Sequence, residues 1–157
     1  MKKFFIILFI FNLSLISYSK NKVVYESQLI EKRGIVYYFN SDTPYSGKAI
    51  SKKNRSYYFK GKAHGKWLTF YSNGNLKSIE NWKNGKLFGR YVLYQENGNK
   101  IFETTYLNGK DNGDYYLFHK NGQVQVQGRF SNGIPKGTWK YYNDKGKLIG
   151  KATYPEN

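Results

Sequence analysis

Residues 82–105, WKNGKLFGRYVLYQENGNKIFETT, match the rest of the chain when the sequence is shifted by 24 positions. Twelve of the 16 glycines keep this frame without an insertion. They are Gly61, Gly65, Gly74, Gly85, Gly89, Gly98, Gly109, Gly113, Gly122, Gly133, Gly137 and Gly146. A fixed period of this length indicates a repeat protein built from one supersecondary unit.

Aromatic residues follow the same period in three registers. The first holds Tyr58, Trp82, Tyr106, Phe130 and Tyr154, the second Trp67, Tyr91, Tyr115 and Trp139, and the third Phe70, Tyr94, Phe118 and Tyr142. Each unit therefore contributes the same aromatic positions to its neighbours, as expected when repeats stack against one another.

Asn-Gly pairs mark the turns inside this frame. They begin at Asn73, Asn84, Asn97, Asn108, Asn121 and Asn132, at alternating spacings of 11 and 13 residues. Both residues tolerate the positive φ of a tight hairpin turn, and the segments between them have strand length. The predicted fold is all-β: an elongated, twisted, single-layer antiparallel meander of 24-residue β-hairpin repeats, with no helix beyond the N-terminal segment.

Four glycines have a predicted structural role, because each precedes a second-register aromatic residue by two positions. They are Gly65, Gly89, Gly113 and Gly137. A side chain there is expected to collide with the adjacent hairpin or to require a forbidden φ.

Side-chain alternation predicts that the sheet has one apolar face and one polar face exposed to solvent. Leu76, Ser78, Glu80 and Trp82 share the apolar face, although Glu80 breaks the pattern. The opposite face carries Lys77, Gln125, Gln127, Arg129, Lys151 and Thr153, with only scattered Ile79, Ile101 and Ile149. This is the alternation of a sheet that buries one side.

The chain divides into three parts. Residues 1–19 read as a signal peptide: Lys2 and Lys3 precede a short apolar run, and the small residues Ser17 and Ser19 place cleavage before Lys20. Residues 20–57 are expected to form an N-terminal cap, with a hairpin turning at Arg33-Gly34 and one degenerate repeat. Residues 58–157 hold four repeats and the start of a fifth. Export would lead to the periplasm, the cell surface or the medium.

The charge limits the class of partner. Without Lys2 and Lys3, 24 Lys and Arg face 10 Asp and Glu, so the mature chain carries a net charge of +14. Such an excess favours acidic partners or simply keeps the surface soluble. The lysines are dispersed, which disfavours a nucleic-acid patch. The absence of cysteine excludes disulfides and a lipoprotein anchor.

The sequence predicts no catalysis, cofactor or metal site. His64 and His119 are the only histidines and occupy different phases of the repeat, so we interpret both as structural. Asp111 and Asp114 flank a turn in a single unit, and no pair of acids recurs in the frame. The chain is therefore interpreted as a non-enzymatic protein.

The candidate binding residues form a ladder along the array. Trp67, Tyr91, Tyr115 and Trp139 would lie one per hairpin, with Lys66, Arg90 and Lys140 beside them. Such a ladder could stack on sugars or peptide side chains while its cations neutralise acidic groups. The alternative is that the aromatic residues are the core of a thin sheet.

The unit G-K-x-x-G-x-[WY]-x-x-[YF]-x-x-x-G, present as residues 61–74, resembles the MORN repeat family and more narrowly its bacterial YwqK-type antitoxin variant. Residues 34–37 and 41–47 also resemble the opening of that group. The resemblance implies an elongated hairpin sheet, roles in scaffolding, membrane association or protein binding, and no catalysis. The antitoxin variant implies neutralisation of a toxin, usually in the cytoplasm. The predicted signal peptide departs from that picture, unless the toxin is also exported and the pair acts at the envelope.

The leading hypothesis is an exported repeat protein that binds a macromolecule, foremost a protein, at the envelope or outside the cell. An anionic polymer or lipid is the alternative ligand, and nucleic acid is disfavoured. Edge strands could also pair copies of the chain. A toxin-neutralising antitoxin and an electrostatic lipid scaffold are the alternative functions.

Overall fold

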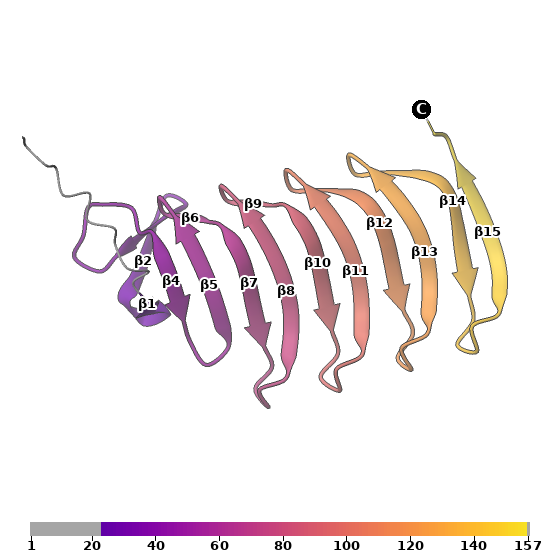
Figure 1. Cartoon of the computed structure of the whole chain (residues 1–157), viewed down its shortest axis with the longest axis horizontal. Coiled ribbons are helices and arrows are strands. Elements are labelled where there is room, and N and C mark those ends of the chain that lie inside the picture. The colour runs from indigo at the N-terminus through magenta and orange to yellow at the C-terminus, as the bar shows by residue number, and fades with distance from the viewer. Residues whose placement is uncertain (1–22, 157) are drawn as a thin grey trace, which may run out of the picture.

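The computed structural model describes residues 23–156, and the signal peptide predicted for residues 1–19 lies outside them. One sheet runs through the molecule, with its strands side by side in nearly the order of the chain (Figure 1). The repeat strands are β4 (Gly47–Ile50), β5 (Asn54–Phe59), β6 (Lys62–Ala63), β7 (Gly65–Phe70), β8 (Leu76–Lys83), β9 (Lys86–Leu87), β10 (Gly89–Tyr94), β11 (Lys100–Leu107), β12 (Lys110–Phe118), β13 (Val124–Ser131), β14 (Ile134–Tyr142) and β15 (Leu148–Tyr154). All of these pair antiparallel, which confirms the predicted meander of hairpins.

The N-terminal cap contains the predicted hairpin and two elements that were not predicted. Strands β2 (Leu29–Lys32) and β3 (Ile35–Tyr38) pair as a separate two-stranded sheet. They turn at Arg33 and Gly34, whose φ values are 51° and 77°. Strand β1 (Val23–Tyr25) joins the large sheet parallel to β4, and a 3₁₀ helix, η1 (Glu26–Gln28), follows it. At this end the sheet is therefore mixed, with one parallel pair that the sequence did not predict.

The cap holds the one cluster of buried apolar side chains in the described residues. Val24, Val36, Tyr45 and Ala49 form it, and Leu29, Tyr38 and Tyr58 pack against it. The small sheet thus closes one end of the array, as a terminal repeat must when it has no neighbour on that side.

The Asn-Gly turns are of two kinds, whereas the sequence suggested one. At Asn84, Asn108 and Asn132 both turn residues have positive φ, as in a type I′ hairpin. At the other three, only the glycines Gly74, Gly98 and Gly122 do. There the side chains of Asn73, Asn97 and Asn121 instead accept hydrogen bonds from the backbone N–H two residues later, at 2.9, 3.0 and 3.0 Å. These longer loops shift the register at the strand ends, which explains the alternating spacing.

The four glycines singled out in the sequence all have positive φ. The values are 68° at Gly65, 89° at Gly89, 128° at Gly113 and 62° at Gly137. Crowding by the adjacent hairpin is less severe than predicted, and the positive φ is the stronger restriction on these residues. A Cβ at Gly89 would lie 3.7 Å from Asn81, an ordinary contact, and one at Gly113 would lie 3.2 Å from Thr105. The left-handed backbone is thus the main reason for glycine at these sites.

The sheet has two different faces because neighbouring residues of a strand point to opposite sides. Cross-strand partners share a face, so Trp67 lies with Glu80 and Thr69 with Ser78, while Lys66 lies with Asn81 and Leu68 with Ile79. We call the side of Trp67 the aromatic face and the side of Lys66 the basic face. Each continues through the array by the same registers.

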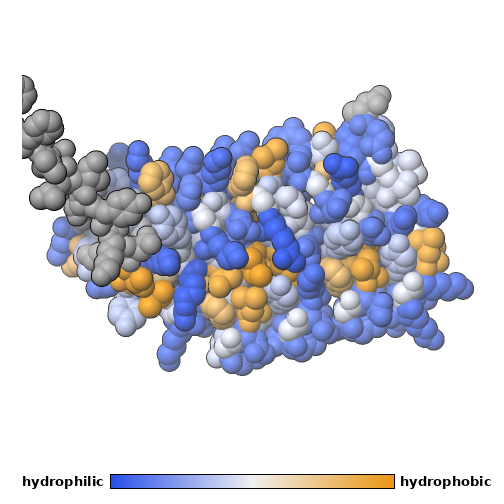
Figure 2. All heavy atoms as spheres, viewed as in Figure 1, coloured by the Kyte–Doolittle hydropathy of each residue, from blue (hydrophilic) through white to orange (hydrophobic). Residues whose placement is uncertain are grey.

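The basic face carries more apolar side chains than the sequence predicted. Val92 points to this side, because it pairs with Ile79, and its side chain is fully buried. On the face seen in Figure 2, an apolar patch lies over the middle strands β7 to β10 and is surrounded by polar side chains. The stems of long lysine and arginine side chains can cover such a patch while their charged ends stay in water.

On the aromatic face, the buried polar side chains form hydrogen bonds with other side chains of the same face. Ser78 and Thr104 are only 2% and 1% exposed. Glu80, which breaks the apolar pattern in the sequence, accepts hydrogen bonds from the Ser78 hydroxyl and the Trp82 indole N–H, both at 2.9 Å. Its carboxylate is therefore satisfied, as a half-buried charge requires.

Candidate functional site

The predicted aromatic ladder exists, and its rings pack against those of the first register. Ring centroids lie 5.1 Å apart between Tyr58 and Trp67, 5.5 Å between Trp67 and Trp82, and 4.9 Å between Phe130 and Trp139. Trp139 is only 8% exposed, and Trp67, Tyr91 and Tyr115 are partly buried. The most common geometry is edge-to-face, which is favourable for aromatic pairs. The ladder therefore serves as the core of this thin sheet, as the alternative interpretation held.

The cations expected beside the ladder lie on the other face. Lys66 pairs with Asn81, Arg90 with Thr105 and Lys140 with Lys151, whereas the aromatic residues next to them pair on the opposite side. Adjacent positions in a strand cannot share a face. The predicted combination of Trp67, Tyr91, Tyr115 and Trp139 with these cations as one surface is therefore wrong.

Arg90 is held in an ion pair rather than left for a ligand. Glu103 accepts hydrogen bonds from Arg90 Nε at 2.5 Å and from Lys100 Nζ at 2.6 Å. The hydrogen bond from Arg90 is the largest cause that lowers the pKa of Glu103, and the same bond raises the pKa of Arg90. This part of the basic face is thus internally neutralised.

The N-terminal half of the basic face carries positive charge without neutralisation. Lys48, Arg55, Lys66 and Lys77 are exposed there. Both ion pairs found within residues 23–156 involve Glu103, so none of these four cations has a carboxylate partner. The paired positions on this side are Tyr57, Leu68, Ile79 and Asn81, which bear no negative charge.

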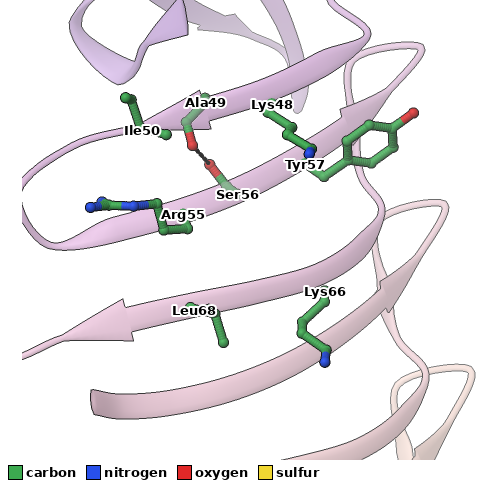
Figure 3. Close-up of a pocket in the computed structure, with 8 residues that line it drawn as sticks. All are labelled: Lys48, Ala49, Ile50, Arg55, Ser56, Tyr57, Lys66 and Leu68. Carbon is green, nitrogen blue, oxygen red and sulfur yellow. Dashed lines mark hydrogen bonds between the residues drawn. The ribbon is translucent and has the colours of Figure 1, made fainter. Parts of the chain in front are cut away.

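A small cavity of about 280 Å³ lies among three of these cations. Lys48, Arg55 and Lys66 line it together with Ile50, Tyr57 and Leu68. Figure 3 shows Lys48 and Tyr57 side by side on neighbouring strands, with Lys66 beyond them and Arg55 toward the other end of the pocket. Of these residues the sequence had singled out only Lys66, because the pocket depends on the pairing of β4, β5 and β7, which lie across the boundary between the cap and the regular repeats.

A second hollow, of about 520 Å³, lies on the aromatic face where the cap hairpin meets the repeats. Tyr58, Trp67 and Trp82 form its apolar wall, and Glu31 and Lys62 are among its polar residues. Both indole N–H groups are already used, by the Tyr57 carbonyl at 2.8 Å and by Glu80. Only ring faces remain available to a ligand there.

The histidines and acids lie in structural contacts. His64 lies against the rings of Tyr57 and Phe59, and His119 Nε2 is 2.9 Å from the Tyr142 carbonyl oxygen. Asp111 accepts a hydrogen bond from Thr104. No group of three or more His, Cys, Asp or Glu side chains that could hold a metal ion occurs among the residues described. In the same part of the chain, no helix is both long and apolar enough to span a membrane.

The hairpins give the most direct comparison with known proteins. Residues 63–84, 111–132 and 135–154 were matched to a family model described as MORN repeat variant. Three segments of this chain match MORN repeats. They coincide with the hairpins β7–β8, β12–β13 and β14–β15. MORN repeats are generally associated with binding to membranes or proteins.

Two solved structures share a weaker likeness. TarM of S. aureus, in complex with fondaparinux, α-GlcNAc-glycerol and UDP, has a TM-score of 0.38 and 13% identity over 57% of this chain and 18% of its own. The Glycosylation Associate Protein (Gap123) complex from Streptococcus agalactiae also has a TM-score of 0.38, with 16% identity over 76% of this chain and 20% of its own. The chain thus spans at most a fifth of either protein. No curated protein matches the sequence.

The aromatic face leads to a prediction for alkaline solution. Burial raises the pKa of Tyr91, Tyr106 and Tyr115, and that of Tyr106 reaches about 12 with the help of nearby Asp111. As the pH rises above 10, the unfolded chain loses these protons first, so the contribution of these tyrosines to stability is unchanged below pH 10 and becomes unfavourable between pH 10 and 12. Tyrosinate absorbance at 295 nm should therefore rise together with the loss of the β-sheet circular dichroism signal.

Tyr106→Phe provides the control, because it keeps the ring and removes the phenol with the highest pKa. The alkaline midpoint should move to higher pH in this variant. Complete ionisation of every tyrosine by pH 11 with an unchanged circular dichroism spectrum would contradict the packing described here.

Proposed function

We propose that this protein is exported, has no catalytic activity and binds another macromolecule, foremost a protein, at the cell envelope or outside the cell. The observation that carries the proposal is the difference between the two faces of the sheet. The aromatic face is used for packing, whereas the N-terminal half of the basic face presents exposed, unneutralised cations around apolar side chains. The general association of MORN repeats with proteins or membranes supports a binding role.

Photo-crosslinking in cells tests this proposal at chosen positions of the full chain. Tyr57, which lines the basic-face pocket, is replaced by p-benzoylphenylalanine, and Phe88, which is 38% exposed, is replaced in a matched control. Both changes exchange one aromatic ring for another. We expect a discrete, protease-sensitive adduct in the envelope fraction or medium from position 57 and none from position 88.

Other results would favour the alternatives. Absence of any adduct at position 57 would contradict binding of a protein through this face. A cytosolic adduct with an uncleaved chain would instead support the YwqK-type antitoxin function, with the adduct as the toxin. Salt-sensitive recovery with membranes and without an adduct would support the lipid scaffold.

A further inference from the structure

The pocket on the basic face combines charge with an apolar floor. Lys48 on β4, Tyr57 on β5 and Lys66 on β7 line it from three neighbouring strands. Lys48 pairs directly with Tyr57. Leu68 lines the same pocket. It follows Lys66 by two residues on β7, so both side chains lie on the basic face. A segment that crosses these strands would therefore meet a cation, an apolar surface and a second cation.

Arg55 adds a fixed positive charge at the edge of this pocket. Its guanidinium donates to the backbone carbonyl oxygens of Ser51 at 2.5 Å and Asn54 at 2.9 Å, and it lies 5.4 Å from the centroid of the Phe70 ring. These contacts position the group and leave its charge without a carboxylate. Binding an acid here would cost little ordering of this side chain.

We propose that this pocket binds an acidic segment of the partner protein, in which two carboxylates flank an apolar side chain. The inference rests on the proposed function and specifies the partner's chemistry. Pure polyanions such as sugar acids or lipid headgroups would satisfy the cations and leave Tyr57 and Leu68 uncovered. A peptide with both kinds of side chain covers the whole site.

Spacing supports the same occupant. Neighbouring strands are about 4.8 Å apart, so Lys48 and Lys66 lie roughly 10 Å apart across β5. In an extended peptide, side chains at positions i, i+2 and i+4 face one way, and the outer two are roughly 13 Å apart. Lysine side chains are long and flexible enough to bridge the difference. The pattern acid–x–apolar–x–acid therefore matches the order of Lys48, Tyr57 and Lys66.

The test uses a fluorescein-labelled peptide containing Glu-Ser-Leu-Ser-Glu, with the binding to the full mature chain measured by fluorescence anisotropy at low salt. Two further peptides replace both Glu by Gln or Leu by Ser. Lys48→Gln combined with Lys66→Gln removes the two flanking cations. Lys86→Gln combined with Lys110→Gln removes the same charge from exposed positions beside the type I′ turns.

We expect the Lys48/Lys66 variant to bind the peptide about tenfold more weakly, whereas the Lys86/Lys110 variant binds as the native chain does. Replacing Leu by Ser in the peptide should weaken binding by about tenfold, because the apolar contact is lost. The Gln peptide should show no binding. Circular dichroism melting confirms that both variants remain folded.

Three results would overturn the inference. Equal weakening in the two double variants would show unspecific attraction to net charge. Equal binding of the Leu and Ser peptides would show that the apolar floor has no role. Binding of heparin or of phosphatidylglycerol vesicles through Lys48 and Lys66 without binding of the peptide would assign the pocket to an anionic polymer or membrane. In each case the crosslinked partner at position 57 would still decide the proposed function separately.

Discussion

Replacing Gly128 by alanine is expected to lower the free energy of unfolding by about 1–3 kcal/mol, the usual cost of overpacking. A Cβ on Gly128 would lie 2.2 Å from Cδ2 of Trp139, inside its indole ring. The backbone of Gly128 is not in the left-handed region, so the cost is purely steric. Trp139 would have to leave its contacts with Tyr115 and Phe130, whose ring centroids lie 5.6 and 4.9 Å away.

A double-mutant cycle identifies the cause. Trp139→Ala alone should cost about 3 kcal/mol, as expected for a buried aromatic residue. In that background Gly128→Ala should cost nothing, because the ring it would strike is gone. Gly150→Ala is the matched control: it also lies in a strand without positive φ, and its nearest atom, in Tyr141, is 3.9 Å away. Thermal and urea unfolding measure all four variants. If the two substitutions change the free energy of unfolding additively, the packing of Trp139 over Gly128 is contradicted.

The second large effect is expected from Gly89→Val and Gly113→Val. Valine at φ values of 89° and 128° is a steric outlier, and each strained residue costs about 1–3 kcal/mol. Gly113→Val also brings its Cβ to 3.2 Å from Thr105. The double variant should therefore lose its β-sheet circular dichroism signal or its solubility.

Asparagine distinguishes backbone strain from crowding at the same positions. Gly89→Asn should be clearly milder than Gly89→Val, since asparagine tolerates positive φ better than other residues with a side chain. If instead the double valine variant melts like the native chain, the repeat geometry is wrong. If asparagine and valine are equally harmful at position 89, crowding rather than φ would be the cause.

The period of 24 residues was sufficient to predict the hairpins, their turns and the glycines with positive φ. These features depend on the conformation of one or two residues, and Asn84-Gly85 or Gly89 carry that information locally. The distinction between the two kinds of Asn-Gly turn was missed because the dipeptide is identical. Only the structure shows that the Asn73 side chain accepts a hydrogen bond within its loop, whereas the backbone of Asn84 adopts a positive φ.

The candidate site was harder to predict, because it depends on which strand lies beside which. Lys66 and Arg90 were grouped with Trp67 and Tyr91 since they are adjacent in sequence, although alternation in a strand separates them. The pocket of Lys48, Tyr57 and Lys66 joins the degenerate repeat to the first regular one and has no equivalent in the frame. Likewise Gly128 stands outside the twelve periodic glycines, and its importance comes from Trp139 on the next strand.

Cell fractionation combined with mass spectrometry of the intact N-terminus shows whether this binding protein is exported. We expect a mature chain that begins at or near Lys20 and is found in the envelope or the medium. An uncleaved chain that begins with Met1 and stays in the cytosol would contradict it, and would direct the search for a partner to a toxin inside the cell.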